Sequence, residues 1–243
     1  MNRWSIILGS TLGLLLFGAL LGGQSRADIR TQDLIATLTP VQDTTIFSGS
    51  PNSNRGGSDA TDLWVGDGGP FGEERVLIQF SLSTVPVSVT IQQALLQLTL
   101  DQVATGYSPQ PLSISIHRVT QSWAEATTWS QMANNFAESY ATVTVGDTSA
   151  CAFDITRLVR AWRAYDAGQG GFQNFGLMVK ATAFVPGIQK IFFSREAKTQ
   201  GVPGAQPPTL QIFSGPPAPL PPSPPVLPNR LFLPLVSQAA TCP

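Results

Sequence analysis

Eight Asp and Glu residues of this sequence could serve in acid–base catalysis. Two carboxyl groups about 5–9 Å apart across a cleft would form a glycosidase pair. The candidates are Asp62, Asp67, Glu73, Glu74, Glu125, Asp147, Asp154 and Glu196. Each has a structural alternative: Asp154 precedes Thr156 and can bond the amides of a turn there, and Glu125 can bond the loop between Trp123 and Trp129. We therefore expect no catalytic residue, with an enzyme as the less favoured alternative.

Nucleophilic catalysis and zinc binding find little support. The chain has one histidine, His117, which shares the polar phase of a strand with Ser113 and Ser115, and no G-x-S-x-G elbow occurs. The two cysteines, Cys151 and Cys242, lie far apart, too few with one histidine for a zinc site. Cys151 follows the apolar phase of its strand, which predicts a buried small side chain, and nothing in the sequence demands a disulfide between the two.

Calcium is the metal that the sequence favours most. The loops Asn52–Asp62 and Asp67–Glu74 are rich in carboxylates, amides and carbonyls, the ligands that a hard cation prefers. The candidate ligands of a structural calcium are Asp43, Asn54 and Asp62. The alternative is that the Asn, Gly and Ser residues of these loops simply form turns.

Sugar binding requires a flat aromatic surface with planar polar groups beside it. The candidate ligand-binding residues are Trp64, Phe71, Arg75 and Tyr107. Phe71 and Tyr107 lie in Gly-containing loops, where an exposed aromatic ring has little structural role. Arg75 suits a bidentate contact with a uronate, or else pairs with an internal acid. The other three tryptophans of the folded part, Trp123, Trp129 and Trp162, are expected in the core.

Alternating apolar and polar residues indicate the elements that position these side chains. Between residues 37 and 214 the chain contains many short segments of period two, separated by polar turns. The expected strands include 76–82, 94–100, 112–117, 143–145, 150–155, 176–180, 190–194 and 208–213. This pattern predicts an all-β fold, an antiparallel β-sandwich of jelly-roll type. One helix is expected, Arg157–Tyr165, capped by Thr156, ended by Gly168 and lying across one end of the sandwich with Trp162 buried.

The two ends of the chain indicate export. Residues 1–27 have the features of a cleavable signal peptide: Arg3, the charge-free apolar run Ile6–Leu21, and small residues before Asp28. An uncleaved membrane anchor is the alternative, although the apolar run is short for one. We expect a linker over 28–36, a sandwich domain over 37–214 and a secreted or cell-surface protein.

The C-terminal part divides into a spacer and a tail. Residues 215–230 form a proline-rich linker, with eight prolines between Pro216 and Pro228, so an extended semi-rigid spacer is expected. Residues 231–243 form a tail with the apolar patch Leu231–Val236, too short to span a membrane. The tail either docks onto a partner or a sheet edge, or it frays.

Composition excludes several classes of function. The net charge is −1 and charged residues are only 12% of the chain, without a basic run. A nucleic-acid partner is therefore not expected. With 42% hydrophobic residues spread evenly, the chain is neither disordered nor a polytopic membrane protein.

An ordered series of motifs resembles the DNRLRE-domain proteins, also classed as carbohydrate-binding module family 96 and related to the disaggregatase repeat. The motifs are DTTIFSGSPNSNRGGS (Asp43–Ser58), LWVG (Leu63–Gly66), ERVLIQFSLSTVP (Glu74–Pro86), VTIQQALLQLTL (Val89–Leu100), RVTQSWAEATTW (Arg118–Trp129), FDITRLVRAW (Phe153–Trp162), FQNFGLMV (Phe172–Val179), and FFSREA with PPTLQI (Phe192–Ala197, Pro207–Ile212). The main departure is Ser81, where the family usually carries Asp. The resemblance covers roughly Leu38–Phe213.

The resemblance implies a secreted or cell-surface jelly-roll module that binds polysaccharide and is not itself catalytic. We therefore predict a non-catalytic module that binds a polysaccharide or cell-surface glycan, or mediates adhesion. Two alternatives stay open. One is a structural coat protein attached by its tail, and the other is a polysaccharide lyase or hydrolase.

Overall fold

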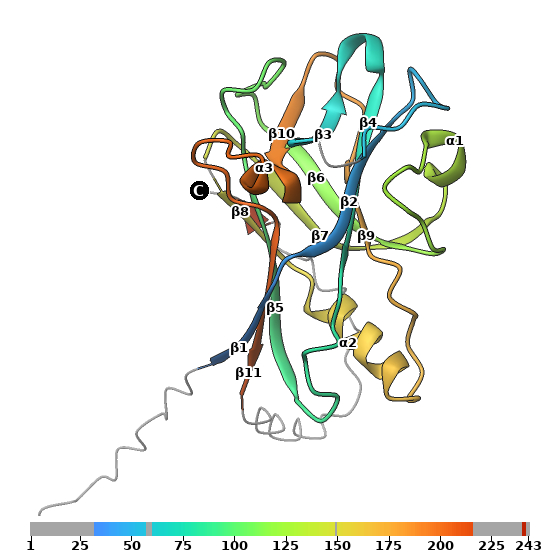
Figure 1. Ribbon diagram of the computed structural model, residues 1–243, viewed down its shortest axis with the longest axis vertical. Helices are drawn as coiled ribbons and strands as arrows, with labels where there is room; N and C mark the ends of the chain where they lie inside the picture. Colours follow the sequence, from blue (N-terminus) through green and yellow to red (C-terminus); the bar gives the residue numbers. More distant parts are fainter. Residues whose placement is uncertain (1–31, 57–59, 149, 216–239, 242–243) are drawn as a thin grey trace, which may run out of the picture. The chain divides into compact units, whose positions relative to one another are not determined.

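Two mostly antiparallel sheets form the body of the protein in a computed structural model, which describes residues 32–56, 60–148, 150–215 and 240–241. The smaller sheet has the order β1 (Asp33–Leu38), β11 (Thr209–Ser214), β5 (Ile91–Thr99) and β8 (Ala150–Asp154). The larger has the order β10 (Gln189–Phe193), β3 (Asp62–Asp67), β4 (Glu73–Phe80), β9 (Leu177–Ala181), β6 (Leu112–Val119), β7 (Phe136–Val145) and β12 (Ala240–Thr241), with β2 (Pro40–Phe47) also paired to β4. The expected all-β sandwich is confirmed (Figure 1).

Strand alternation places the main core between the two sheets. Val76, Ile78 and Phe80 of β4 are buried there with the inward side chains of β5 and β6. The outer face of the larger sheet is also partly buried. There Leu77 packs with Ile46 and other residues in a second apolar cluster, against which Trp123 packs. The outward phase of β4 is therefore apolar only at Leu77, which makes burial continuous over residues 76–78.

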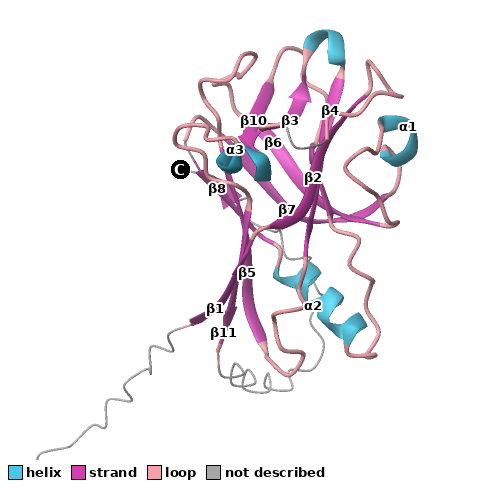
Figure 2. Cartoon of the chain, viewed as in Figure 1, coloured by secondary structure: helices cyan, strands magenta, loops and turns pink. Residues whose placement is uncertain are grey.

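Helices are few and short beside the strands (Figure 2). They are η1 (Gly69–Phe71), α1 (Trp129–Met132), α2 (Thr156–Asp166) and α3 (Arg195–Thr199). No helix in the described ranges is long and apolar enough to cross a membrane.

The expected helix is present as α2, with Trp162 fully buried and Gly168 at φ +68° just beyond its end. Its start differs from the prediction. Asp154 accepts hydrogen bonds from the Thr156 amide (2.9 Å) and hydroxyl (2.5 Å), and the Thr156 hydroxyl accepts from the Ala94 amide of β5 (2.9 Å). Thr156 therefore ties the helix to the sheet instead of capping it, because Ile155 occupies the position before the first turn.

Several motif residues meet in one partly buried ionic cluster. The Arg195 guanidinium pairs with Glu125 (2.6 Å) and Glu196 (2.5 Å), and the Arg195 amide donates to Asp43 (2.9 Å). A Cβ at Gly56 would collide with the Glu125 carbonyl, so only glycine lets the loop after β2 pass there. The cluster holds three segments far apart in the sequence, and its residues are scaffold.

The ends of the chain are described only in part. β1 begins at Asp33, inside the stretch expected as a linker, and pairs with β11. Ala240 and Thr241 pair in parallel with Val143 and Thr144 of β7. The expected signal peptide, the proline-rich stretch 216–228, the apolar patch 231–236 and Cys242 lie outside the described residues.

Candidate functional site

A pocket of about 600 Å³ opens where β3, η1, β10 and the loop after β5 come together. Its lining combines aromatic, acidic, amide and guanidinium side chains. The residues are Arg55, Thr61, Asp62, Trp64, Gly68, Phe71, Asp101, Val103, Ala104, Thr105, Gly106 and Gln189. A concave surface of this size with mixed lining is the usual form of a small-molecule or sugar site.

The apolar part of the pocket is an aromatic pair. The Phe71 ring lies 5.8 Å from the Trp64 ring, centroid to centroid, and 5.6 Å from the Phe47 ring that supports it. Phe71 is 37% exposed and Val103, on the rim, is 94% exposed. The Arg55 guanidinium carbon lies 3.5 Å from the Trp64 ring centroid, so one indole face carries a cation. The pocket therefore presents exposed apolar carbon next to a planar donor.

The polar part comes from strand ends. Asp62 begins β3 and lies near Asp101, and burial first, then the Asp101 charge, raises the pKa of Asp62. Two hydrogen bonds to the backbone hold Asp101 in place. Its carboxylate accepts from the Val103 amide (3.2 Å), and its own amide donates to the Ile191 carbonyl (2.8 Å). These hydrogen bonds fix the Asp101 carboxylate, an acceptor that suits the hydroxyl groups of a ligand.

A buried carboxyl group lies behind this lining. Glu74 is 0% exposed, and the Gln189 side-chain amide donates to its Oε2. Within the described part of the chain, Glu74 Oε1 and Trp64 Nε1 have no hydrogen-bond partner. Burial raises the pKa of Glu74 to about 7. A Cβ at Gly68 would press against this carboxyl group, so the backbone of the pocket lining passes directly over the Glu74 side chain.

Two of the four predicted ligand-binding residues line the pocket, Trp64 and Phe71, and two do not. Arg75 pairs with Glu73 (2.8 Å), donates to the Ala133 carbonyl (2.5 Å) and lies over the Trp129 ring (4.5 Å). It therefore fastens α1 to the sheet.

Tyr107 follows in the same loop as Asp101 but is not part of the pocket lining. Its hydroxyl donates to Asp147 (2.5 Å) and its ring lies 4.9 Å from the Lys190 ammonium. Burial and the Asp147 carboxylate raise the pKa of Tyr107 to about 12.

The three predicted calcium ligands are used differently. Asp62 lines the pocket, Asn54 is exposed on the loop after β2, and Asp43 is buried in the ionic cluster. Burial raises the pKa of Asp43 to about 8, which disfavours the charged form that a cation needs. The described ranges contain no group of three or more His, Cys, Asp or Glu side chains suited to a metal. Calcium binding by Asp43, Asn54 and Asp62 therefore stays a sequence-based prediction.

Sequence reasoning missed Arg55, Asp101 and Gln189. Arg55 had a signal, because it is the one cation in the Asn-, Gly- and Ser-rich run after β2. Asp101 and Gln189 had none. Gln189 reaches the pocket through the register that pairs it with Gly66, and Asp101 through the hydrogen bond from its amide to the Ile191 carbonyl.

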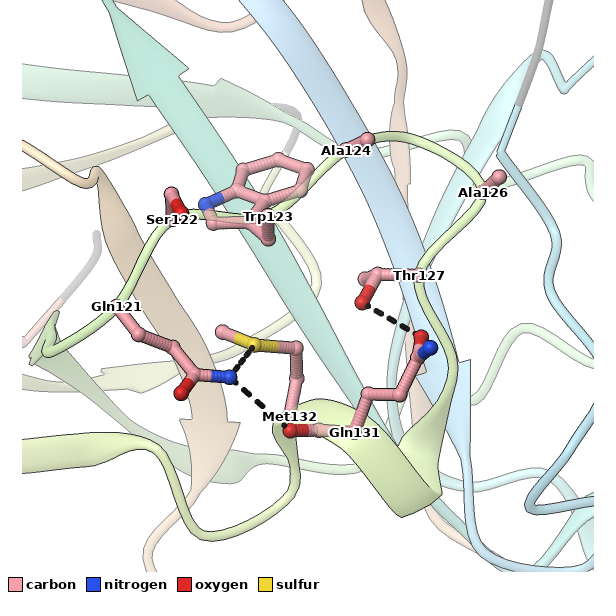
Figure 3. A pocket seen from close by; sticks show the side chains of 8 residues that line it. All are labelled: Gln121, Ser122, Trp123, Ala124, Ala126, Thr127, Gln131 and Met132. Atoms are coloured by element: carbon pink, nitrogen blue, oxygen red, sulfur yellow. Dashed lines mark hydrogen bonds between the residues drawn. The ribbon is translucent and has the colours of Figure 1, made fainter.

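A second pocket, of about 380 Å³, lies between the Trp123 loop and α1 (Figure 3). Its lining carries no charged side chain: Gln121, Ser122, Trp123, Ala124, Ala126, Thr127, Gln131 and Met132. The Trp123 ring borders it on one side and Met132 on the other, and Trp123 Nε1 donates to the Phe175 carbonyl (2.8 Å).

The single histidine is paired with a serine. Ser115 Oγ lies 2.9 Å from His117 Nε2, and His117 Nδ1 lies 2.8 Å from the Ala137 carbonyl. Burial lowers the pKa of His117. Ser115 is only 3% exposed on the middle of a strand, so its hydroxyl is closed to a substrate carbonyl, and the pair is structural.

Comparison with known protein families gives a match over most of the chain. The sequence profile of carbohydrate-binding module family 96 matches residues 34–201, which include β2 to β10, all of β1 except Asp33, and the lining residues of both pockets. A search of curated proteins finds no match.

Proposed function

The chain belongs to carbohydrate-binding module family 96, and from this membership we propose that the pocket at Trp64 and Phe71 binds polysaccharide. The observation that carries the proposal is the lining itself. An exposed aromatic edge lies beside a guanidinium, two carboxylates and an amide in one cavity. The apolar face of a pyranose suits the ring of Phe71, and its hydroxyls suit the polar groups.

The charge balance favours an uncharged ligand. Asp62 and Asp101 flank the pocket, with Glu74 behind it, against the single guanidinium of Arg55. A uronate would meet two carboxylates for one cation, whereas neutral hydroxyl groups donate to the same carboxylates. We therefore propose a neutral polysaccharide as the ligand of this pocket.

The proposal describes a binding module without catalysis. Glu74 has the raised pKa of a general acid, but it is fully buried behind Gly68 and Gln189. Such burial keeps its proton away from a glycosidic oxygen. Export to the cell surface is part of the same proposal, and it rests on the signal-like residues 1–27.

The experiment is affinity electrophoresis of the protein through gels that contain neutral or acidic polysaccharides, each with and without EDTA. The proposal expects retardation by at least one neutral polysaccharide and release of no reducing sugar from it. Retardation abolished by EDTA would support the predicted calcium. Migration unchanged by every polysaccharide would overturn the proposed function.

A further inference from the structure

The second pocket, between the Trp123 loop and α1, has the chemistry of a sugar subsite of its own. The Trp123 indole and the Met132 side chain form apolar walls, and Gln121, Ser122 and Thr127 supply amide and hydroxyl groups between them (Figure 3). The pocket has a volume of about 380 Å³, which suits a ligand of the size of one or two sugar rings.

Some of its polar groups are held by the protein and others remain for a ligand. Gln131 Oε1 accepts from the Thr128 amide (3.0 Å) and the Thr127 hydroxyl (3.2 Å), which fixes the wall formed by α1. The Gln121 amide nitrogen donates to Met132 Sδ (3.2 Å). Among the described residues, Gln121 Oε1 and the Ser122 hydroxyl have no partner in the protein. Both residues are exposed, and both groups suit sugar hydroxyls.

The uncharged lining decides the class of ligand. A carboxylate or sulfate entering this pocket would lose hydration without meeting a cation, whereas a neutral pyranose exchanges its water for an indole face and amides. We propose that this pocket is a second carbohydrate-binding subsite that takes a neutral sugar ring against Trp123.

One loop joins the two pockets. The loop after β2 bonds α1 through Ser130, whose amide donates to the Pro51 carbonyl (2.9 Å) and whose hydroxyl donates to Asn52 (2.8 Å). The same loop carries Arg55 into the Trp64 pocket. A polysaccharide that occupies both pockets gains from a high effective concentration at the second. This inference rests on the proposed function in taking sugar as the ligand of the module.

The test is NMR of the indole N–H resonances, assigned with Trp64→Phe and Trp123→Phe, during titration with neutral tetrasaccharides of gluco, galacto, manno and xylo configuration. A uronic-acid tetrasaccharide is the acidic probe. The resonance of Trp123 is expected to shift with a neutral probe and not with the acidic one. Gln121→Ala is expected to weaken that response several-fold. Gln206→Ala, an exposed glutamine before β11, serves as the matched control and leaves it unchanged.

The outcomes separate this inference from the proposed function. A neutral probe that shifts Trp64 but never Trp123 would overturn the second subsite and leave the first intact. An equal shift of Trp123 by the acidic probe would overturn its assignment to neutral sugars. If neither tryptophan responds to any probe, the proposed function fails as well.

Discussion

Glu74 is the residue whose protonation links the pocket to the stability of the fold. Its pKa is raised from 4.5 to about 7, chiefly by burial. The folded protein therefore takes up a proton that the unfolded chain lacks between these values, and the free energy of unfolding falls as pH rises from 4.5 to about 7. The full effect is roughly 3 kcal/mol.

Glu74→Gln removes this ionisation and keeps the acceptor for Gln189. We predict that the variant gains stability relative to the native protein by up to roughly 3 kcal/mol on going from about pH 5 to about pH 8. Urea denaturation at both pH values measures the difference. If the free energy of unfolding changes equally with pH in the two proteins, Glu74 does not have the raised pKa.

At the scale of elements, α2 depends on a single hydroxyl. Thr156 accepts the amide hydrogen of Ala94 in β5 and donates to Asp154. Thr156→Val keeps the shape of the side chain but leaves the buried Ala94 amide without an acceptor, which costs about 1–3 kcal/mol. Thr156→Ser keeps the hydroxyl and is the control. Chemical denaturation should give a lower free energy of unfolding for the valine variant than for the serine variant. Equal free energies of unfolding would contradict the role of this hydrogen bond.

The elements also show what sequence periodicity can predict. Alternation along β4, β5 and β6 predicted strands because one phase of each faces the core between the sheets. The spacing of Leu158 and Trp162 and the glycine at 168 predicted α2 for the same reason. α3 has only five residues and begins at the Ser194 side-chain cap, and η1 has three residues between glycines. Elements this short carry no periodic signal.

At the scale of the whole molecule, the candidate site was predictable only in part. Trp64, Phe71 and Asp62 lie within one stretch of about ten residues, where composition suggested ligand chemistry. Gln189 comes from β10, which pairs with β3. Asp101 comes from the loop after β5, which the hydrogen bond from its amide to Ile191 holds beside β10. Arg75 was a reasonable candidate by type, but strand alternation turns it toward Trp129.

The central claim is that Phe71 and its neighbours form a polysaccharide-binding surface. The most direct measurement is titration calorimetry with a polysaccharide that retards the protein in the affinity gel. It compares the native protein with the variants Phe71→Ala and Phe172→Ala. Phe172 is a matched control, 39% exposed against 37% for Phe71, and stacked under Arg118 outside both sugar pockets. We predict that Phe71→Ala weakens binding roughly tenfold or more, as loss of a central aromatic contact does, and that Phe172→Ala binds as the native protein. Equal affinity of all three proteins would contradict the assignment of the site.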